Sequence, residues 1–195
     1  MIYLIRHGQT DWNLEHRKLG QADIPLNATG CDQAKQSIKQ LTSLKIEQII
    51  SSDLLRAKET ANIINATLHL PISFDVRLRE RNYGDLEGVL EKDILPETWD
   101  ILNKDSQKIH AESSEAIYKR VRSFFNEIDI SKNILVVTHG GIIRMAMFLL
   151  QHPQSFSKKD FLENALQFRA KNAVVFKWNA AGLKEYMAGS AIKKV

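Results

Sequence analysis

Ile134-Leu135-Val136-Val137-Thr138-His139-Gly140-Gly141 is followed by an apolar segment that continues to Leu150. An unbroken aliphatic run such as 134–137 is typical of a parallel strand that is covered on both faces. The two glycines predict a turn into a helix over 142–150, which is apolar nearly all round and therefore deeply buried. A buried strand leading directly into a buried helix indicates an α/β fold.

The rest of the chain repeats this alternation of strand and helix. Apolar runs predict strands at 2–5, 48–51, 72–74 and 173–178, with a further one around 185–188. Helical spacing predicts a helix that Thr29 caps, a helix that Asp53 caps and Pro71 stops, a weak helix near 91–104, and a helix that Ser113 or Ser114 caps. We therefore expect a three-layer α/β/α sandwich with a mainly parallel central sheet. Residues 1–195 are expected to form a single domain, with 89–112 as a cap over the active site.

Composition excludes several classes of protein. The 195 residues carry a net charge of +4, which is too little for the dense basic face of a nucleic-acid binder. No window is apolar for long enough to span a bilayer, and the N-terminus has no secretory leader pattern, so we expect a cytoplasmic protein without a membrane partner. The single cysteine, Cys31, excludes an intramolecular disulfide and a multi-thiolate metal site.

Polar residues follow three of the predicted strands. Arg6-His7-Gly8 comes after the first, Ser51-Ser52-Asp53 with Arg56 after the second, and Thr138-His139-Gly140-Gly141 after the strand at 134–137. Ligands of open α/β sheets gather at the carboxyl ends of the strands. The sequence therefore predicts that two histidines and two arginines from distant segments meet in one cleft.

These residue types suit phosphoryl transfer. Arg6 and Arg56 can each hold two phosphoryl oxygens through a planar guanidinium, and His139, if protonated, adds a donor and a charge. The helix that starts at Gly140 offers free backbone N–H groups. Neutral His7 can attack phosphorus, and Gly8 is interpreted as leaving room for the phosphate beside the backbone.

A carboxylic acid is also needed, to protonate the leaving oxygen and later to deprotonate water. Three candidates lie in the segment 78–88, and we choose Glu80. Spacing alone does not separate Glu80 from Asp85 or Glu87.

Five stretches of the sequence resemble the motifs of one known family, and they occur in that family's order. The stretches are Arg6-His7-Gly8-Gln9-Thr10-Asp11-Trp12-Asn13, Asp23-Ile24-Pro25-Leu26-Asn27-Ala28-Thr29-Gly30, Ser51-Ser52-Asp53-Leu54-Leu55-Arg56-Ala57-Lys58-Glu59-Thr60-Ala61, Leu78-Arg79-Glu80 and Val137-Thr138-His139-Gly140-Gly141. The chain resembles the histidine phosphatase superfamily, with its phosphoglycerate mutase-like fold.

The resemblance implies a role for each site residue. It implies that His7 carries the phosphoryl group, that Arg6, Arg56 and His139 bind it, and that Glu80 is the acid and base. Asn13 matches a family position near the phosphate pocket. The resemblance also implies that neither a metal nor another cofactor is needed.

The sequence identifies the subfamily less clearly than it identifies the superfamily. Glu80-Arg81-Asn82-Tyr83 is close to the mutase form of its loop, whereas the mixture of acidic and basic residues in 89–112 favours a hydrolase of the broad-specificity or α-ribazole-phosphate phosphatase type. We therefore expect a phosphatase acting on a small phosphorylated metabolite. A phosphoglycerate mutase is the alternative, and a non-catalytic phosphate-binding module is a third. The sequence does not decide whether the protein forms a homodimer. The remaining histidines are interpreted as structural or exposed, namely His16, His69, His110 and His152.

Overall fold

The structure, a computed structural model, describes residues 1–152, 155–165, 170–178 and 184–185. Within these residues six strands form one sheet in the order β3-β2-β4-β1-β5-β6. The strands are β1 (Ile2–Arg6), β2 (Gln48–Ser51), β3 (Ile72–Phe74), β4 (Ile134–Thr138), β5 (Val175–Trp178) and β6 (Lys184–Glu185). Each predicted strand is present, and the part of the last prediction beyond Glu185 lies outside the described residues.

The run at 134–137 forms the centre of the sheet. β4 pairs in parallel with β1 on one side and with β2 on the other, and β2 pairs in parallel with β3. The strands β5 and β6 add an antiparallel edge beyond β1. This arrangement confirms the predicted mainly parallel sheet.

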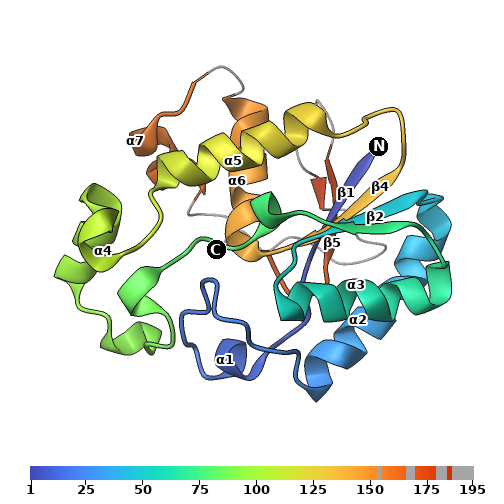
Figure 1. The fold of residues 1–195 in the computed structure, drawn as a ribbon, viewed down its shortest axis with the longest axis horizontal. Coiled ribbons are helices and arrows are strands. Elements are labelled where there is room, and N and C mark those ends of the chain that lie inside the picture. Colours follow the sequence, from blue (N-terminus) through green and yellow to red (C-terminus); the bar gives the residue numbers. More distant parts are fainter. Residues whose placement is uncertain (153–154, 166–169, 179–183, 186–195) are drawn as a thin grey trace.

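Helices cover both faces of the sheet (Figure 1). Ile134 and Val136 of β4 pack in one core with α5 (Ser114–Glu127) and α6 (Gly140–Gln151). Leu135 and Val137, which point to the opposite face, pack with α2 (Ala28–Leu41) and α3 (Leu55–Leu68). Because alternate residues of one strand enter two separate cores, the molecule has the three layers that the sequence predicts.

Two predicted helix caps are wrong. Helix α2 is capped by Asn27, whose side chain accepts a hydrogen bond from the Gly30 N–H, so Thr29 lies inside the first turn. Asp53 does not cap α3 because its carboxylate pairs with Arg79. The Leu55 N–H donates instead to Asp23 Oδ1 at 2.6 Å, so the cap comes from a residue far away in the sequence.

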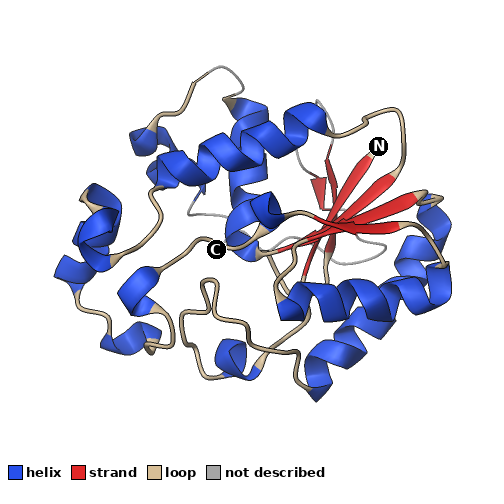
Figure 2. Cartoon of the chain, in the orientation of Figure 1, coloured by secondary structure: helices blue, strands red, loops and turns tan. Residues whose placement is uncertain are grey.

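The segment between β3 and α5 consists of short helical turns around one α-helix (Figure 2). The predicted weak helix near 91–104 is α4 (Pro96–Lys104), which starts at the proline, preceded by the turn η4 (Glu91–Asp93). The other turns are η2 (Val76–Leu78), η3 (Gly84–Leu86) and η5 (Ser106–Ile109). Leu86, Ile94, Leu102 and Ala111 give this segment a small core of its own. It lies on the left in Figure 1, beyond the end of the sheet at which β1 and β4 finish.

Four short elements complete the described chain. They are α1 (Asp11–Leu14), η1 (Thr42–Leu44), α7 (Lys158–Asp160) and the π-helical turn η6 (Phe161–Ala165). None of the helices that the structure describes has the length and apolar character that a membrane crossing requires.

Candidate active site

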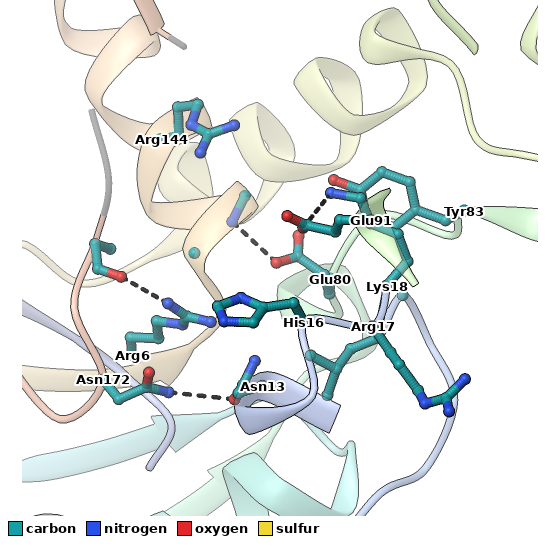
Figure 3. A pocket seen from close by; sticks show the side chains of 15 residues that line it. Arg6, Asn13, His16, Arg17, Lys18, Glu80, Tyr83, Glu91, Arg144 and Asn172 are labelled. Carbon is teal, nitrogen blue, oxygen red and sulfur yellow. Dashed lines mark hydrogen bonds and ion pairs between the residues drawn. The ribbon is translucent and has the colours of Figure 1, made fainter. Parts of the chain in front are cut away.

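The carboxyl ends of β1, β2 and β4 bring the predicted residues together. Arg6 ends β1 opposite Thr138, and Ser51 of β2 lies opposite Val137 of β4, so the residues that follow these strands are neighbours. The rings of His7 and His139 have their centroids 5.1 Å apart. A cavity of about 300 Å³ opens beside them, lined by Arg6, Asn13, Glu80 and Gly140 among others (Figure 3). His7, Arg56 and His139 are themselves buried.

His7 is held as a neutral ring with one defined free nitrogen. Its Nδ1 lies 2.7 Å from the carbonyl oxygen of Gly8. Because a carbonyl only accepts, Nδ1 carries the hydrogen and Nε2 keeps its lone pair. Burial, together with the charges of Arg56 and Arg6, holds the pKa of His7 well below the ordinary histidine value. The ring is therefore neutral at neutral pH, with an unprotonated Nε2.

His139 is oriented by Ser52. Its Nε2 lies 2.9 Å from Ser52 Oγ, which also accepts a hydrogen bond from the Leu54 N–H. Because a hydroxyl can accept twice and donate once, either direction of this bond is chemically allowed; we assign Ser52 as the donor to Nε2, which places the hydrogen of the neutral His139 ring on Nδ1. Burial and the neighbouring Arg56 hold the pKa of His139 well below the ordinary value. In this structure His139 is thus a neutral donor, and it does not add the charge that a protonated ring would add.

Within the described residues, neither fully buried Arg56 nor half-buried Arg6 has an acidic side chain bound to it. Arg6 donates to the Ala170 carbonyl, and Arg56 donates to the carbonyls of Gly20 and Ala22. Among the described residues neither forms an ion pair. Burial lowers the pKa of Arg56 to about 10, so it stays charged at neutral pH.

Three buried donors in this group have no hydrogen-bond partner in the described part of the chain. They are Arg6 Nε, Arg56 Nε and His139 Nδ1. The one other such side-chain atom, Ser114 Oγ, lies at the start of α5. Buried donors and cations without a partner are costly unless a ligand satisfies them. These three donors are therefore groups that an anionic ligand would satisfy, and of their residues Arg6 lines the cavity.

Glu80 lies at the N-terminus of α6. Its Oε2 accepts from the Gly141 N–H at 2.9 Å, and its Oε1 accepts from the Arg81 N–H at 2.9 Å. The other two acid candidates are placed elsewhere. Asp85 is exposed and pairs with His110, whereas Glu87 accepts from the backbone N–H groups of Gln21 and Tyr83 and so organises a loop. Of the three, only Glu80 lines the cavity.

Two glycines have roles that the sequence did not reveal. A Cβ on Gly8 would lie 2.3 Å from the Gly30 carbonyl oxygen, so Gly8 is needed for close contact with α2 rather than for phosphate access. A Cβ on Gly141 would lie 2.2 Å from Glu80 Oε1. Gly141 thus allows the carboxylate to reach the start of α6, and Gly140, the predicted site residue, has only ordinary contacts with Arg6.

Gly141→Ala is therefore expected to displace Glu80. With Glu80 as the general acid, as expected from the sequence, this should lower kcat for alkyl phosphates by about 10²-fold. Steady-state hydrolysis rates measure this effect. In a Glu80→Ala background the same substitution is expected to cost nothing further, because there is no carboxylate left to displace. A full second loss in that background would contradict the role of Gly141.

Asn13 both helps to cap a helix and lines the cavity. Its side chain accepts from the Thr10 N–H and completes a capping box at α1. The same oxygen lies 3.5 Å from Asn172 Nδ2, which also donates to the His7 carbonyl. Asn13 therefore lines the cavity while it fixes the turn after His7.

Sequence reasoning missed several residues of the cavity wall. His16, interpreted as structural or exposed, is exposed but also lines the cavity, and Arg144 stands one helical turn after Gly140 (Figure 3). The other missed residues are Arg17, Lys18, Tyr83, Glu91 and Asn172. The spacing of Arg144 from Gly140 was a readable sign, because residues i and i+4 share a helix face. In the part of the chain that is described, no group of three or more His, Cys, Asp or Glu side chains could hold a metal ion.

A model of the histidine phosphatase superfamily (branch 1) matches residues 2–177. The chain therefore belongs to this superfamily, as the sequence motifs indicated. The match covers all of the site residues described above.

Relatives with known names fall into two groups. The chain is 36% identical over 142 residues to the uncharacterized phosphatase PhoE of Bacillus subtilis, covering 73% of this chain and 72% of the relative. It is 39% identical over 148 residues to the probable phosphoglycerate mutase GpmB of Salmonella paratyphi A, covering 71% and 69%. These names support an enzyme of the phosphatase or mutase type.

Solved structures share the fold. A mycobacterial glucosyl-3-phosphoglycerate phosphatase in complex with VO₃ superimposes with a TM-score of 0.76 at 28% identity, covering 90% of both chains. The protein TTHB049 from Thermus thermophilus gives a TM-score of 0.68 at 30% identity, covering 90% of this chain and 91% of the other. The architecture is therefore that of the phosphoglycerate mutase-like histidine phosphatases.

Proposed function

We propose that the protein hydrolyses a small phosphorylated metabolite through a phosphohistidine on His7, without a metal or another cofactor. The observation that carries this proposal is the set of unpartnered buried donors on Arg6, Arg56 and His139 beside a neutral histidine. A phosphoryl group has three oxygens and a dense negative charge, which match three donors and two cations.

The proposed reaction has two steps. His7 Nε2 attacks phosphorus, the P–O bond to the alcohol breaks, and protonated Glu80 gives its proton to the leaving oxygen. A water molecule then attacks the phosphohistidine and loses a proton to the Glu80 carboxylate, so that the P–N bond breaks and inorganic phosphate leaves. Arg6, Arg56 and His139 hold the phosphoryl oxygens in both steps, with Asn13 and the start of α6 at Gly140 beside them.

We treat residues 1–195 as one catalytic domain in which 89–112 forms the cap. Support comes from the small core of this segment and from its position beyond the carboxyl ends of the strands. An ion pair of 2.7 Å between Glu91 and Lys18 at the cavity wall joins the cap to the loop that follows α1.

Incubation with p-nitrophenyl phosphate and a panel of sugar and nucleotide phosphates, in the presence of a chelator, tests the proposal. Release of phosphate by the wild-type protein and none by His7→Ala is expected. No turnover by the wild type would overturn it.

A phosphoglycerate mutase is a second candidate, favoured by the Glu80-Arg81-Asn82-Tyr83 loop and by the identity to GpmB. It would interconvert the two phosphoglycerates only after priming by bisphosphoglycerate. Hydrolysis without interconversion would decide against it.

The pH dependence of hydrolysis is expected to be bell-shaped, because the first step needs neutral His7 and protonated Glu80. Since the pKa of His7 is lowered, the ring stays neutral as the pH falls past 6.5, and the acid limb lies well below that value. The pH profile of kcat/KM, together with the ¹⁵N shift of the His7 ring, measures this. A His7 ring that titrates near 6.5, or a rate that rises steadily into alkaline pH, would contradict the assignment.

A further inference from the structure

A second cavity adjoins the phosphate site. It has a volume of about 510 Å³ and lies between α4, α6 and η6. Lys18, Tyr83, Glu91, Gly141 and Arg144 line both cavities, so the two spaces meet at the start of α6. Gly141 also holds Glu80 through its N–H. A group bonded to a phosphoryl oxygen near Glu80 is therefore at the entrance of the second cavity.

The far wall of this second cavity is largely apolar. Its apolar side chains come from four helical elements and are Trp99, Leu102, Ile117, Met145, Phe161 and Leu162. Most of them are buried, with Met145 and Leu102 at 0% and 2% exposure. A space of this size and lining is typical of a site for a small organic group.

The charges in the second cavity are largely occupied by the protein itself. Lys18 Nζ is 2.7 Å from Glu91, and it lies 4.6 Å from the Trp99 ring centroid and 5.3 Å from that of Tyr83. The Arg81 guanidinium donates to the carbonyls of Glu112 and Leu102. Arg144 lies where the two cavities meet, and its charge adds to the effect of burial in lowering the pKa of Arg6.

We infer that the second cavity binds the alcohol part of the substrate and that this part is apolar, uncharged and large enough to contain a ring system. The inference rests on the proposed phosphatase function and adds its substrate class. An apolar ring replaces water on Trp99 and Leu162 and leaves the Lys18–Glu91 ion pair intact.

A panel of phosphate monoesters that differ only in the alcohol part tests this assignment. Phenyl phosphate and 1-naphthyl phosphate have leaving groups of similar acidity but different apolar area, and 3-phosphoglycerate carries a second anionic group. We expect kcat/KM for 1-naphthyl phosphate to exceed that for phenyl phosphate by about tenfold, in the range that pockets gain from added apolar groups. We expect 3-phosphoglycerate to be the poorest of the three.

Substitutions in the lining of the second cavity test whether this lining causes the preference for 1-naphthyl phosphate. Trp99→Ala and Leu162→Gln are each expected to lower the naphthyl-to-phenyl ratio by about fivefold or more, chiefly through KM, because they remove apolar contact. Phe74→Ala, which removes an exposed aromatic ring on β3, is the matched control and should leave the ratio unchanged.

The outcomes separate the two proposals. Hydrolysis of all three esters with a ratio near one, or with a ratio that neither Trp99→Ala nor Leu162→Gln changes, overturns the assignment of the second cavity and leaves the phosphatase function standing. Preference for 3-phosphoglycerate also overturns it. Absence of hydrolysis of every ester overturns the proposed function, and the substrate class with it.

Discussion

Replacing His7 by alanine is expected to lower the rate of phosphate-ester hydrolysis by on the order of 10⁴-fold or more, because loss of a covalent nucleophile removes the whole pathway. The structure gives the physical reason. The Nδ1–H of His7 is fixed on the Gly8 carbonyl, and burial with two nearby arginines keeps the ring neutral, so a lone pair is always available at Nε2. Initial rates with p-nitrophenyl phosphate measure the loss.

His110→Asn is the matched control. His110 is an exposed histidine paired with Asp85, and asparagine tolerates its left-handed backbone. This variant should keep full activity, and thermal unfolding of both variants shows that the fold is intact. Activity of His7→Ala within tenfold of the wild type, in folded protein, would remove His7 from the reaction.

Arg56→Ala is expected to have the second largest effect, a fall in kcat/KM of about 10³-fold, because an arginine on a transferring phosphoryl group contributes this much to the rate. Arg56 is fully buried, and burial lowers its pKa to about 10, so the buried charge is costly and an anionic ligand would offset part of that cost. Inhibition by inorganic phosphate, measured alongside kcat/KM, should weaken in parallel.

Loss of Arg56 also removes the side-chain donor of the Gly20 carbonyl and one of two donors to the Ala22 carbonyl, so Arg56→Ala is expected to lower the melting temperature. Arg56→Lys separates the two effects, since it keeps a charge but not the planar fork. It should regain part of the phosphate affinity and little of the rate. Arg122→Ala, which removes an arginine on α5 that stacks near Tyr118, is the control. An Arg56→Ala protein that binds phosphate as the wild type does would contradict its role.

The sheet and its layers could be predicted from local sequence because the strands are short apolar runs and the helices carry clear periodicity. β4 is the clearest case, with each of its residues buried. The helix starts could not be predicted so well. Asp53 looked like a cap, but its carboxylate pairs with Arg79 and the helix receives its cap from Asp23, contacts that depend on the tertiary fold.

The same limit applies to the candidate site. The motifs placed Arg6, His7, Arg56 and His139 at one sheet edge because parallel strands end together. The orientation of each ring by Gly8 and Ser52 was not readable, since hydrogen-bond partners of this kind are set by packing. The wall formed by His16, Lys18 and Glu91 was missed for a further reason. These residues come from loops with no periodic pattern, and an ion pair across them appears only in the folded chain.

The most direct test of a covalent phosphoryl intermediate is to trap it on His7. The protein is mixed for milliseconds with a ³²P-labelled phosphate ester, quenched in alkali, digested and analysed by mass spectrometry. We expect one labelled peptide that contains His7, stable in base and labile in acid, and no label in His7→Ala. Rapid hydrolysis without any such label, or with label on another residue, would contradict the central claim.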